Sequence, residues 1–176
     1  MSQTLIAIGA LAITITFALS TQRAEIKTDR LKILAESQIL AGQVAQNTLA
    51  HIAVQEFDER TRNTEVERAD QLTPSDGLEW GGCTDYALCD DVDDFHNMTT
   101  VVATPAGGMS YTIDAAVRYV EVGTDGSGEE TVRASSSQTF YKEVTVTVRD
   151  VPRAVEGVAT HIMPVPIRLQ RIVPMT

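Results

Sequence analysis

The stretch from Thr4 to Leu40, "TLIAIGALAITITFALSTQRAEIKTDRLKILAESQIL", passes without a break from an apolar half to an amphipathic half. Between Leu5 and Leu19 no side chain is charged, and the only polar ones are Thr14 and Thr16. With its flanking residues, a segment of about 17 residues makes a helix about 25 Å long, slightly less than the ~30 Å hydrocarbon core of a bilayer. The sequence therefore predicts a marginal transmembrane helix.

A cleaved secretory signal is the alternative interpretation of this apolar segment. A signal begins with basic residues, whereas "MSQT" at 1–4 contains no Lys or Arg, so we favour a helix that the protein keeps. The cations of the region come after the segment, and the positive-inside rule would place that side in the cytoplasm. Removal of a basic leader would resolve this conflict. These cations are Arg23, Lys27, Arg30 and Lys32.

The amphipathic half continues well beyond Leu40. From Thr21 to the charged run near Arg60 there is no Pro, and Gly42 is the one Gly. Apolar residues recur at helical spacing at Ile26, Ile33, Leu34, Leu40, Val44, Ile52 and Phe57. We therefore predict one helix from about Gln3 to about Glu59, roughly 85 Å long. A globular domain can cover only its second half, so the first half needs lipid or other copies of the chain.

The remainder of the chain has the composition of a β domain. We expect strands at 98–104, 109–122 and 139–150, with one or two further strands in 157–175, where prolines favour an edge position. In the third of these, Val144, Val146 and Val148 alternate with polar residues, which indicates a half-buried strand. Polar or Gly-rich loops are expected at 58–77, 105–108 and 123–130. The predicted fold class is α+β, with a long N-terminal helix packed on a small antiparallel sheet.

We divide the chain into a hydrophobic helix half (1–20), an amphipathic helix half (21–60) and a β-rich head (61–176). The formal net charge is −10, and only 14 residues are Lys or Arg, which argues against a nucleic-acid partner. The enzyme motifs that would indicate a nucleophile elbow, zinc protease, P-loop or dinucleotide site are absent, so we expect no catalytic activity.

Two cysteines, Cys83 and Cys89, lie in "CTDYALC". A zinc site would need a closer pair and further ligands, and the three histidines are scattered along the chain. We therefore predict a disulfide that closes a small loop, which implies an oxidising compartment. Two free, buried thiols are the alternative.

An acidic run follows the second cysteine. Clustered carboxylates suit Ca²⁺, which takes six to eight oxygen ligands. We favour a solvated acidic loop held by the disulfide, with calcium binding as the alternative, because the EF-hand pattern and its Gly are missing. The candidate ligands are Asp90, Asp91, Asp93 and Asp94, with Asp85 nearby; a weaker candidate set is Asp125, Ser127, Glu129 and Glu130. The triplet Asn97-Met98-Thr99 also matches a glycosylation acceptor.

The layout from Thr4 to Phe57, a long helix followed by a β domain, resembles that of type IV pilins and pseudopilins. "CDDVDDFH" at 89–96 is similar to the D-V-D-D-[FY]-[HD]-G element of minor pilins of the mannose-sensitive haemagglutinin class, with Asn97 in place of Gly. "FYKEVTVTV" at 140–148 resembles the strand that follows it there. Pilins usually carry Glu at the fifth mature position, where this sequence has Leu5.

The resemblance implies a structural subunit that waits in the bacterial inner membrane and then joins an extracellular or periplasmic filament. Its partners would be copies of itself or other pilins, joined through the N-terminal helix. The alternatives are a monomeric, membrane-anchored binding module of the envelope and a minor pseudopilin of a secretion system. The implied polymerisation core is Leu5, Ile6, Ile8, Leu11, Ile13, Ile15, Phe17, Leu19, Ile26, Ile33 and Leu40.

Overall fold

The protein is described from a computed structural model. It covers residues 2–62, 65–77, 81, 83, 86–104, 108–155 and 158–175; the side chains of 2–6, 153–155 and 158–159 lie outside the description. The predicted turn at 105–108 is therefore described only at Gly108.

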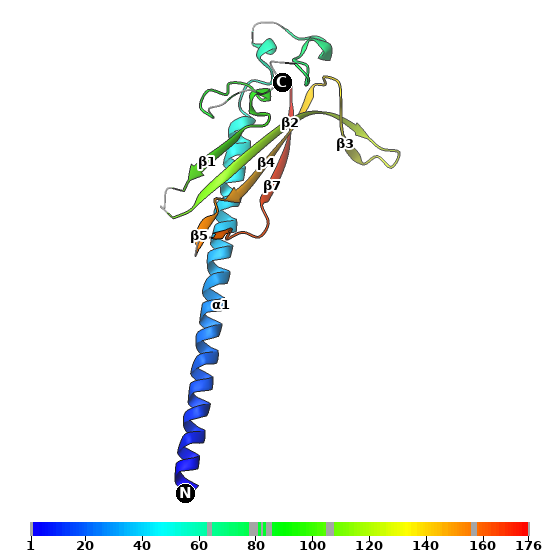
Figure 1. Ribbon diagram of the computed structural model, residues 1–176. Coiled ribbons are helices and arrows are strands. Elements are labelled where there is room, and N and C mark those ends of the chain that lie inside the picture. The colour runs from blue at the N-terminus through cyan, green and yellow to red at the C-terminus, as the bar shows by residue number, and fades with distance from the viewer. Residues whose placement is uncertain are drawn as a thin grey trace.

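One helix, α1 (Ser2–Ile52), makes up the N-terminal third of the chain and extends far beyond the rest of the molecule (Figure 1). Its 51 residues correspond to a length of about 77 Å. The prediction of a single uninterrupted helix is confirmed, but the end near Glu59 was wrong. After Ile52 the backbone bonds tighten to the i→i+3 type, with Gln55 N donating to the Ile52 carbonyl oxygen at 3.2 Å. The chain then turns inward because Phe57 and Asp58 are buried in the head.

The head is built on one antiparallel sheet that lies across the C-terminal half of α1 (Figure 1). The strand order is β1-β2-β4-β7, and β3 pairs with the far end of β2. A separate two-stranded hairpin, β5–β6, lies near the point where α1 leaves the head. The bounds are β1 (Thr99–Ala103), β2 (Ser110–Thr124), β3 (Glu130–Ala134), β4 (Tyr141–Asp150), β5 (Arg153–Val155), β6 (Val158–Thr160) and β7 (Ile167–Pro174). Three short 3-10 turns complete the head: η1 (Glu59–Thr61), η2 (Ala69–Gln71) and η3 (Asp93–Phe95).

The strands predicted at 98–104, 109–122 and 139–150 are confirmed as β1, β2 and β4. The strand β7 lies at an edge of the sheet and ends at Pro174, as the prolines of this region predicted. The predicted loop at 123–130 was too long, because β2 continues to Thr124 and β3 begins at Glu130. The short strands β3 and β5 were not predicted, because neither carries an apolar alternation that distinguishes it from a loop.

The sheet packs on α1 through small helix residues. Ala41 and Ala45 are fully buried beneath the sheet, whose facing strand β4 contributes Val144, Val146 and Val148 as predicted. Ser37 is the first buried residue of the helix, and its hydroxyl lies 3.3 Å from the Tyr111 hydroxyl. The head therefore covers only the C-terminal part of α1, which confirms that the first half lies outside the domain's own core.

The close approach of helix and sheet generates a stability prediction. We expect Ala45→Leu to lower the free energy of unfolding by about 1–3 kcal/mol, because extra methyl groups cannot fit a packed core without displacing the backbone. The matched control is Ala50→Leu, which places the same side chain at an exposed position of the same helix. Urea unfolding of the detergent-solubilised, oxidised protein measures both variants. Equal stability of the two would contradict the packing described here.

Candidate assembly surface and acidic loop

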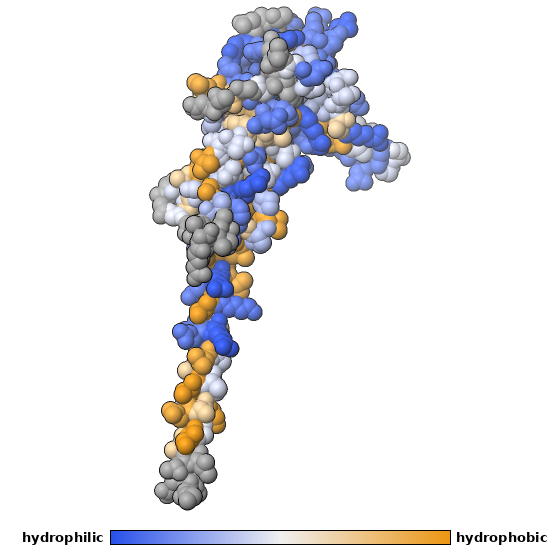
Figure 2. Space-filling model, viewed as in Figure 1, coloured by the Kyte–Doolittle hydropathy of each residue, from blue (hydrophilic) through white to orange (hydrophobic). Residues whose placement is uncertain are grey.

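The first half of α1 presents apolar side chains on all of its sides. Successive residues of an α-helix are rotated by about 100°, so these positions are distributed around the whole circumference. All six of the large ones in the described part are solvent-exposed, by 48% to 73%: Ile8, Leu11, Ile13, Ile15, Phe17 and Leu19. Figure 2 shows them as an apolar section near the free end of the helix. Nothing in the described part of the chain covers this surface.

The predicted core positions further along α1 divide between two environments. Ile26 and Ile33 are exposed, together with Leu31. Leu40 is different, because it is partly buried against the chain's own head. The apolar spacing in the sequence therefore describes two surfaces: one that packs on the sheet and one that stays uncovered. The side chains of Leu5 and Ile6 lie outside the described residues.

A charged band separates the apolar section from the head (Figure 2). It contains the cations Arg23, Lys27, Arg30 and Lys32, all of them exposed. One weak ion pair lies within it, between the Lys32 ammonium and the Asp29 carboxylate at 3.9 Å. Such exposed pairs contribute little to stability. Because Arg23 is the first charged residue of the helix, the uncharged part of α1 ends at about residue 22.

By length and composition, α1 can cross a membrane. Among the described residues it is the one candidate span, and none of its most apolar window is buried inside the protein. That distinguishes it from the buried core helix of a soluble protein, which passes the same test of length and hydropathy. A membrane anchor is therefore compatible with this helix.

At the opposite end of α1, the predicted disulfide is present. Cys83 and Cys89 are bonded, with their Cα atoms 5.5 Å apart. The loop that they close lies over the end of the helix, where the Tyr86 ring stacks on the His51 imidazole at 4.8 Å between centroids. The bond thus fixes a loop that covers the last turn of α1.

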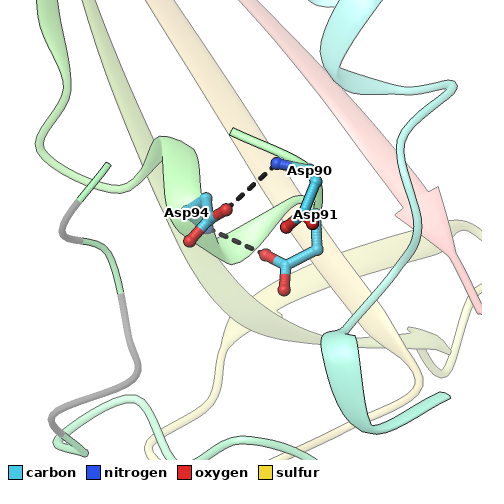
Figure 3. Close-up of side chains that lie close together, drawn as sticks. All are labelled: Asp90, Asp91 and Asp94. Carbon is cyan, nitrogen blue, oxygen red and sulfur yellow. Dashed lines mark hydrogen bonds between the residues drawn. The ribbon is translucent and has the colours of Figure 1, made fainter. Parts of the chain in front are cut away.

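Three of the predicted calcium ligands lie together after this disulfide. Asp90, Asp91 and Asp94 each offer one oxygen, and these atoms lie within 4.8 Å of one another (Figure 3). Two hydrogen bonds link them: Asp90 N donates to an Asp94 carboxylate oxygen at 3.1 Å, and Asp94 N donates to an Asp91 oxygen at 3.0 Å. Partial burial raises the pKa of Asp94. The fifth acid of the run, Asp85, lies outside the described residues.

The carboxylates of this loop have structural partners. Asp91 is buried, and its second oxygen accepts a hydrogen bond from Glu59 N at 3.0 Å. Arg62 forms ion pairs with Asp90 at 3.0 Å and with Glu56 at 2.9 Å. The loop is therefore tied to the segment that leaves α1. These contacts account for the carboxylates as connections within the fold, and the burial of Asp91 departs from the solvated loop that the sequence favoured. Calcium binding stays a prediction.

Asp93 does not join this group, although the sequence placed it there. Its carboxylate points into the core, 2.7 Å from the Lys142 ammonium. Burial raises the pKa of Asp93 to about 8, and Lys142 opposes that rise. Lys142 was not among the residues predicted from the sequence. Its position along the strand could have indicated this role. Lys142 lies two residues before the inward-facing Val144, and alternate residues of a strand face the same side of the sheet.

Two lesser sequence features also have structural explanations. Asn97 has a φ of 60°, a left-handed conformation that Asn tolerates better than most residues. Asp125 accepts hydrogen bonds from Ser127 N and Glu129 N, so it closes the turn between β2 and β3. The Ser127 hydroxyl also donates to this carboxylate, and it lowers the pKa of Asp125 together with the two backbone bonds.

Comparison of the chain with protein families, with curated proteins and with solved structures finds no match.

The role of Asp91 can be measured. We expect Asp91→Ala to lower the free energy of unfolding by about 1–3 kcal/mol, because the backbone N–H groups of Glu59 and Asp94 lose a partly buried acceptor. The control is Asp76→Ala, which removes an exposed carboxylate from a surface turn and should change stability by about 0.5 kcal/mol or less. Thermal and urea unfolding provide the comparison. If Asp91→Ala were as mild as the control, the carboxylate would not be a structural connector.

Proposed function

We propose that this chain is a structural subunit of a type IV pilus-like filament, extracellular or periplasmic, which assembles through the first half of α1. The observation that carries the proposal is the continuous helix whose N-terminal half its own head leaves uncovered on every side. A side chain of this size gains about 1.5–3 kcal/mol when it leaves water, so the segment cannot remain exposed to solvent. Before assembly the surrounding phase is the inner membrane, and afterwards it is the helices of other subunits.

The transfer from lipid to protein needs a driving force other than hydrophobicity, because lipid tails are as apolar as leucine. Close helix packing supplies one, and small residues permit it. Gly9 lies at such a position: a Cβ added there would meet nothing within 4 Å in this chain. A Gly inside a helix costs about 1 kcal/mol relative to Ala. No contact in the described part of the chain accounts for this Gly, which supports a contact with another helix.

A monomeric, membrane-anchored binding module is the second candidate. It is favoured by a hollow of about 390 Å³ on the face of the sheet that points away from α1, lined in part by Asp114, Thr147 and Arg168. Such a module would use α1 only as an anchor. The two candidates differ in what surrounds the apolar half of the helix, which is other helices in a filament and lipid alone in an anchor.

The substitution Gly9→Leu separates these candidates. Leu suits lipid and strengthens the helix, so membrane insertion should be unchanged, whereas a close helix contact would be blocked. We expect electron microscopy of sheared surface material to show filaments with the native chain and few or none with Gly9→Leu. Immunoblots of membrane fractions should show equal amounts of both chains.

The matched control is Ile13→Leu, which changes the shape of an apolar side chain but not its volume, and should leave filaments intact. Identification of this chain in the sheared filaments by mass spectrometry completes the test. If the native protein is found only in membranes and no filament contains it, the proposal fails and the anchored module is supported.

A further inference from the structure

A lysine and two aspartates meet in the core of the head, where water does not reach them. Lys142, Asp93 and Asp58 have relative side-chain exposures of 0%, 1% and 0%. The Lys142 ammonium lies 2.7 Å from an Asp93 oxygen and 3.5 Å from an Asp58 oxygen. It also donates a hydrogen bond to the carbonyl oxygen of Phe57 at 2.6 Å.

Aromatic rings close the remaining sides of this cluster. The Lys142 nitrogen lies 4.4 Å from the centroid of the Phe57 ring and 5.3 Å from that of the Tyr119 ring. Tyr119 is itself buried, and its hydroxyl donates to the carbonyl oxygen of Thr73 at 2.8 Å. An amine and a carboxyl are thus held in contact where burial disfavours ions and excludes water.

Asp58 differs from Asp93 in its hydrogen bonds. Its oxygens accept from Arg60 N at 3.0 Å, from Thr73 N at 2.8 Å and from the Thr73 hydroxyl at 3.0 Å. These bonds fix the position of the Asp58 carboxylate beside the Lys142 nitrogen. The cluster therefore combines an amine, a carboxyl in contact with it and a second carboxylate within reach of the same nitrogen to accept a proton.

We propose that Lys142 and Asp93 form an intramolecular isopeptide bond, an amide between the lysine Nζ and the aspartate Cγ, with Asp58 as the proton carrier. The inference rests on the core of the head and is independent of the filament proposal. The geometry that points to it is the buried contact of nucleophile and carboxyl beside a second carboxylate. A surface lysine–aspartate pair lacks both the dry surroundings and the proton carrier.

The reaction balances without an oxidant or any other co-reactant. Lys142 first passes one proton to Asp93, which leaves a neutral amine and a neutral carboxylic acid. The Nζ lone pair attacks Cγ, and Asp58 takes a proton from the nitrogen. Asp58 then returns this proton to the departing hydroxyl, which leaves as water, and the C–N bond remains. The net charge of the three groups is −1 before and after the step, and Asp58 is regenerated.

The bond would connect two parts of the head that are distant in sequence. Asp93 lies in η3, within the segment that follows the disulfide loop, and Lys142 lies near the start of the central strand β4. The two residues are 49 positions apart. A cross-link of this span restricts the unfolded chain as a disulfide does, but reductants do not cleave it. The turn η3 would then be joined to strand β4 through a covalent connection as well as through packing.

Peptide mapping of the full-length protein in detergent tests the proposal directly. Trypsin does not cleave after an acylated lysine, so the bond joins the peptide 69–118 to an uncut peptide 134–149, with the mass of one water missing. We expect this branched peptide in place of the separate peptides 134–142 and 143–149. Cleavage after Lys142 in the folded native protein, with no branched peptide present, would overturn the proposal.

Two variants test the assigned roles. Lys142→Arg keeps the positive charge but lacks the amine, and Asp58→Asn keeps the size of the side chain but cannot carry the proton; both should lose the branched peptide. The control Asp150→Asn alters another buried carboxylate, which accepts from Ile162 N and contacts no lysine in the described structure, and should retain the bond. Persistence of the branched peptide in Asp58→Asn would overturn the role of Asp58. The tryptic peptide map of the native protein decides whether the isopeptide bond forms, so a variant that fails to fold does not affect that result.

Discussion

The central constraint on this molecule is a helix about 77 Å long that its own head covers only from about Leu34 onward. A sheet of four main strands spans only part of that length, so the apolar side chains between Ile8 and Leu19 must find a surface outside the chain. The apolar part of α1 that precedes Leu34 therefore suits an environment of lipid or other helices rather than contact with the head. The filament proposal follows from this requirement more directly than from any feature of the sheet.

The contact between helix and head depends on residue size. Ala41 and Ala45 allow the sheet to approach the helix axis closely, while larger apolar residues such as Ile39 remain on the opposite side and are exposed. Further along the helix the larger Leu49 and Ile52 are buried as well, so the head combines small and large helix residues. Gly9 is a small residue at a place where the described part of the chain brings nothing within 4 Å of an added Cβ.

Buried charged groups fix the segment that follows α1. Asp91 links the acidic loop to Glu59, and Asp58 holds Thr73 through backbone and side-chain hydrogen bonds. Lys142 then connects Asp58 and Asp93 within the core. Because breaking a buried charge pair is costly, this cluster specifies how the polypeptide leaves α1, whether or not the lysine becomes acylated.

The long helix, the α+β class, the disulfide and the main strands could be predicted from the sequence, because they depend on local periodicity, composition and spacing. The common face of Val144, Val146 and Val148 could be predicted as well, since alternation along a strand fixes the face. The end of the helix could not be predicted in this way, because the burial of Phe57 and Asp58 in the head overrides the helical composition around them. The tertiary structure likewise separated Asp93 from the neighbouring Asp91 and Asp94, since adjacent residues of a tight turn point in different directions and their partners come from distant strands.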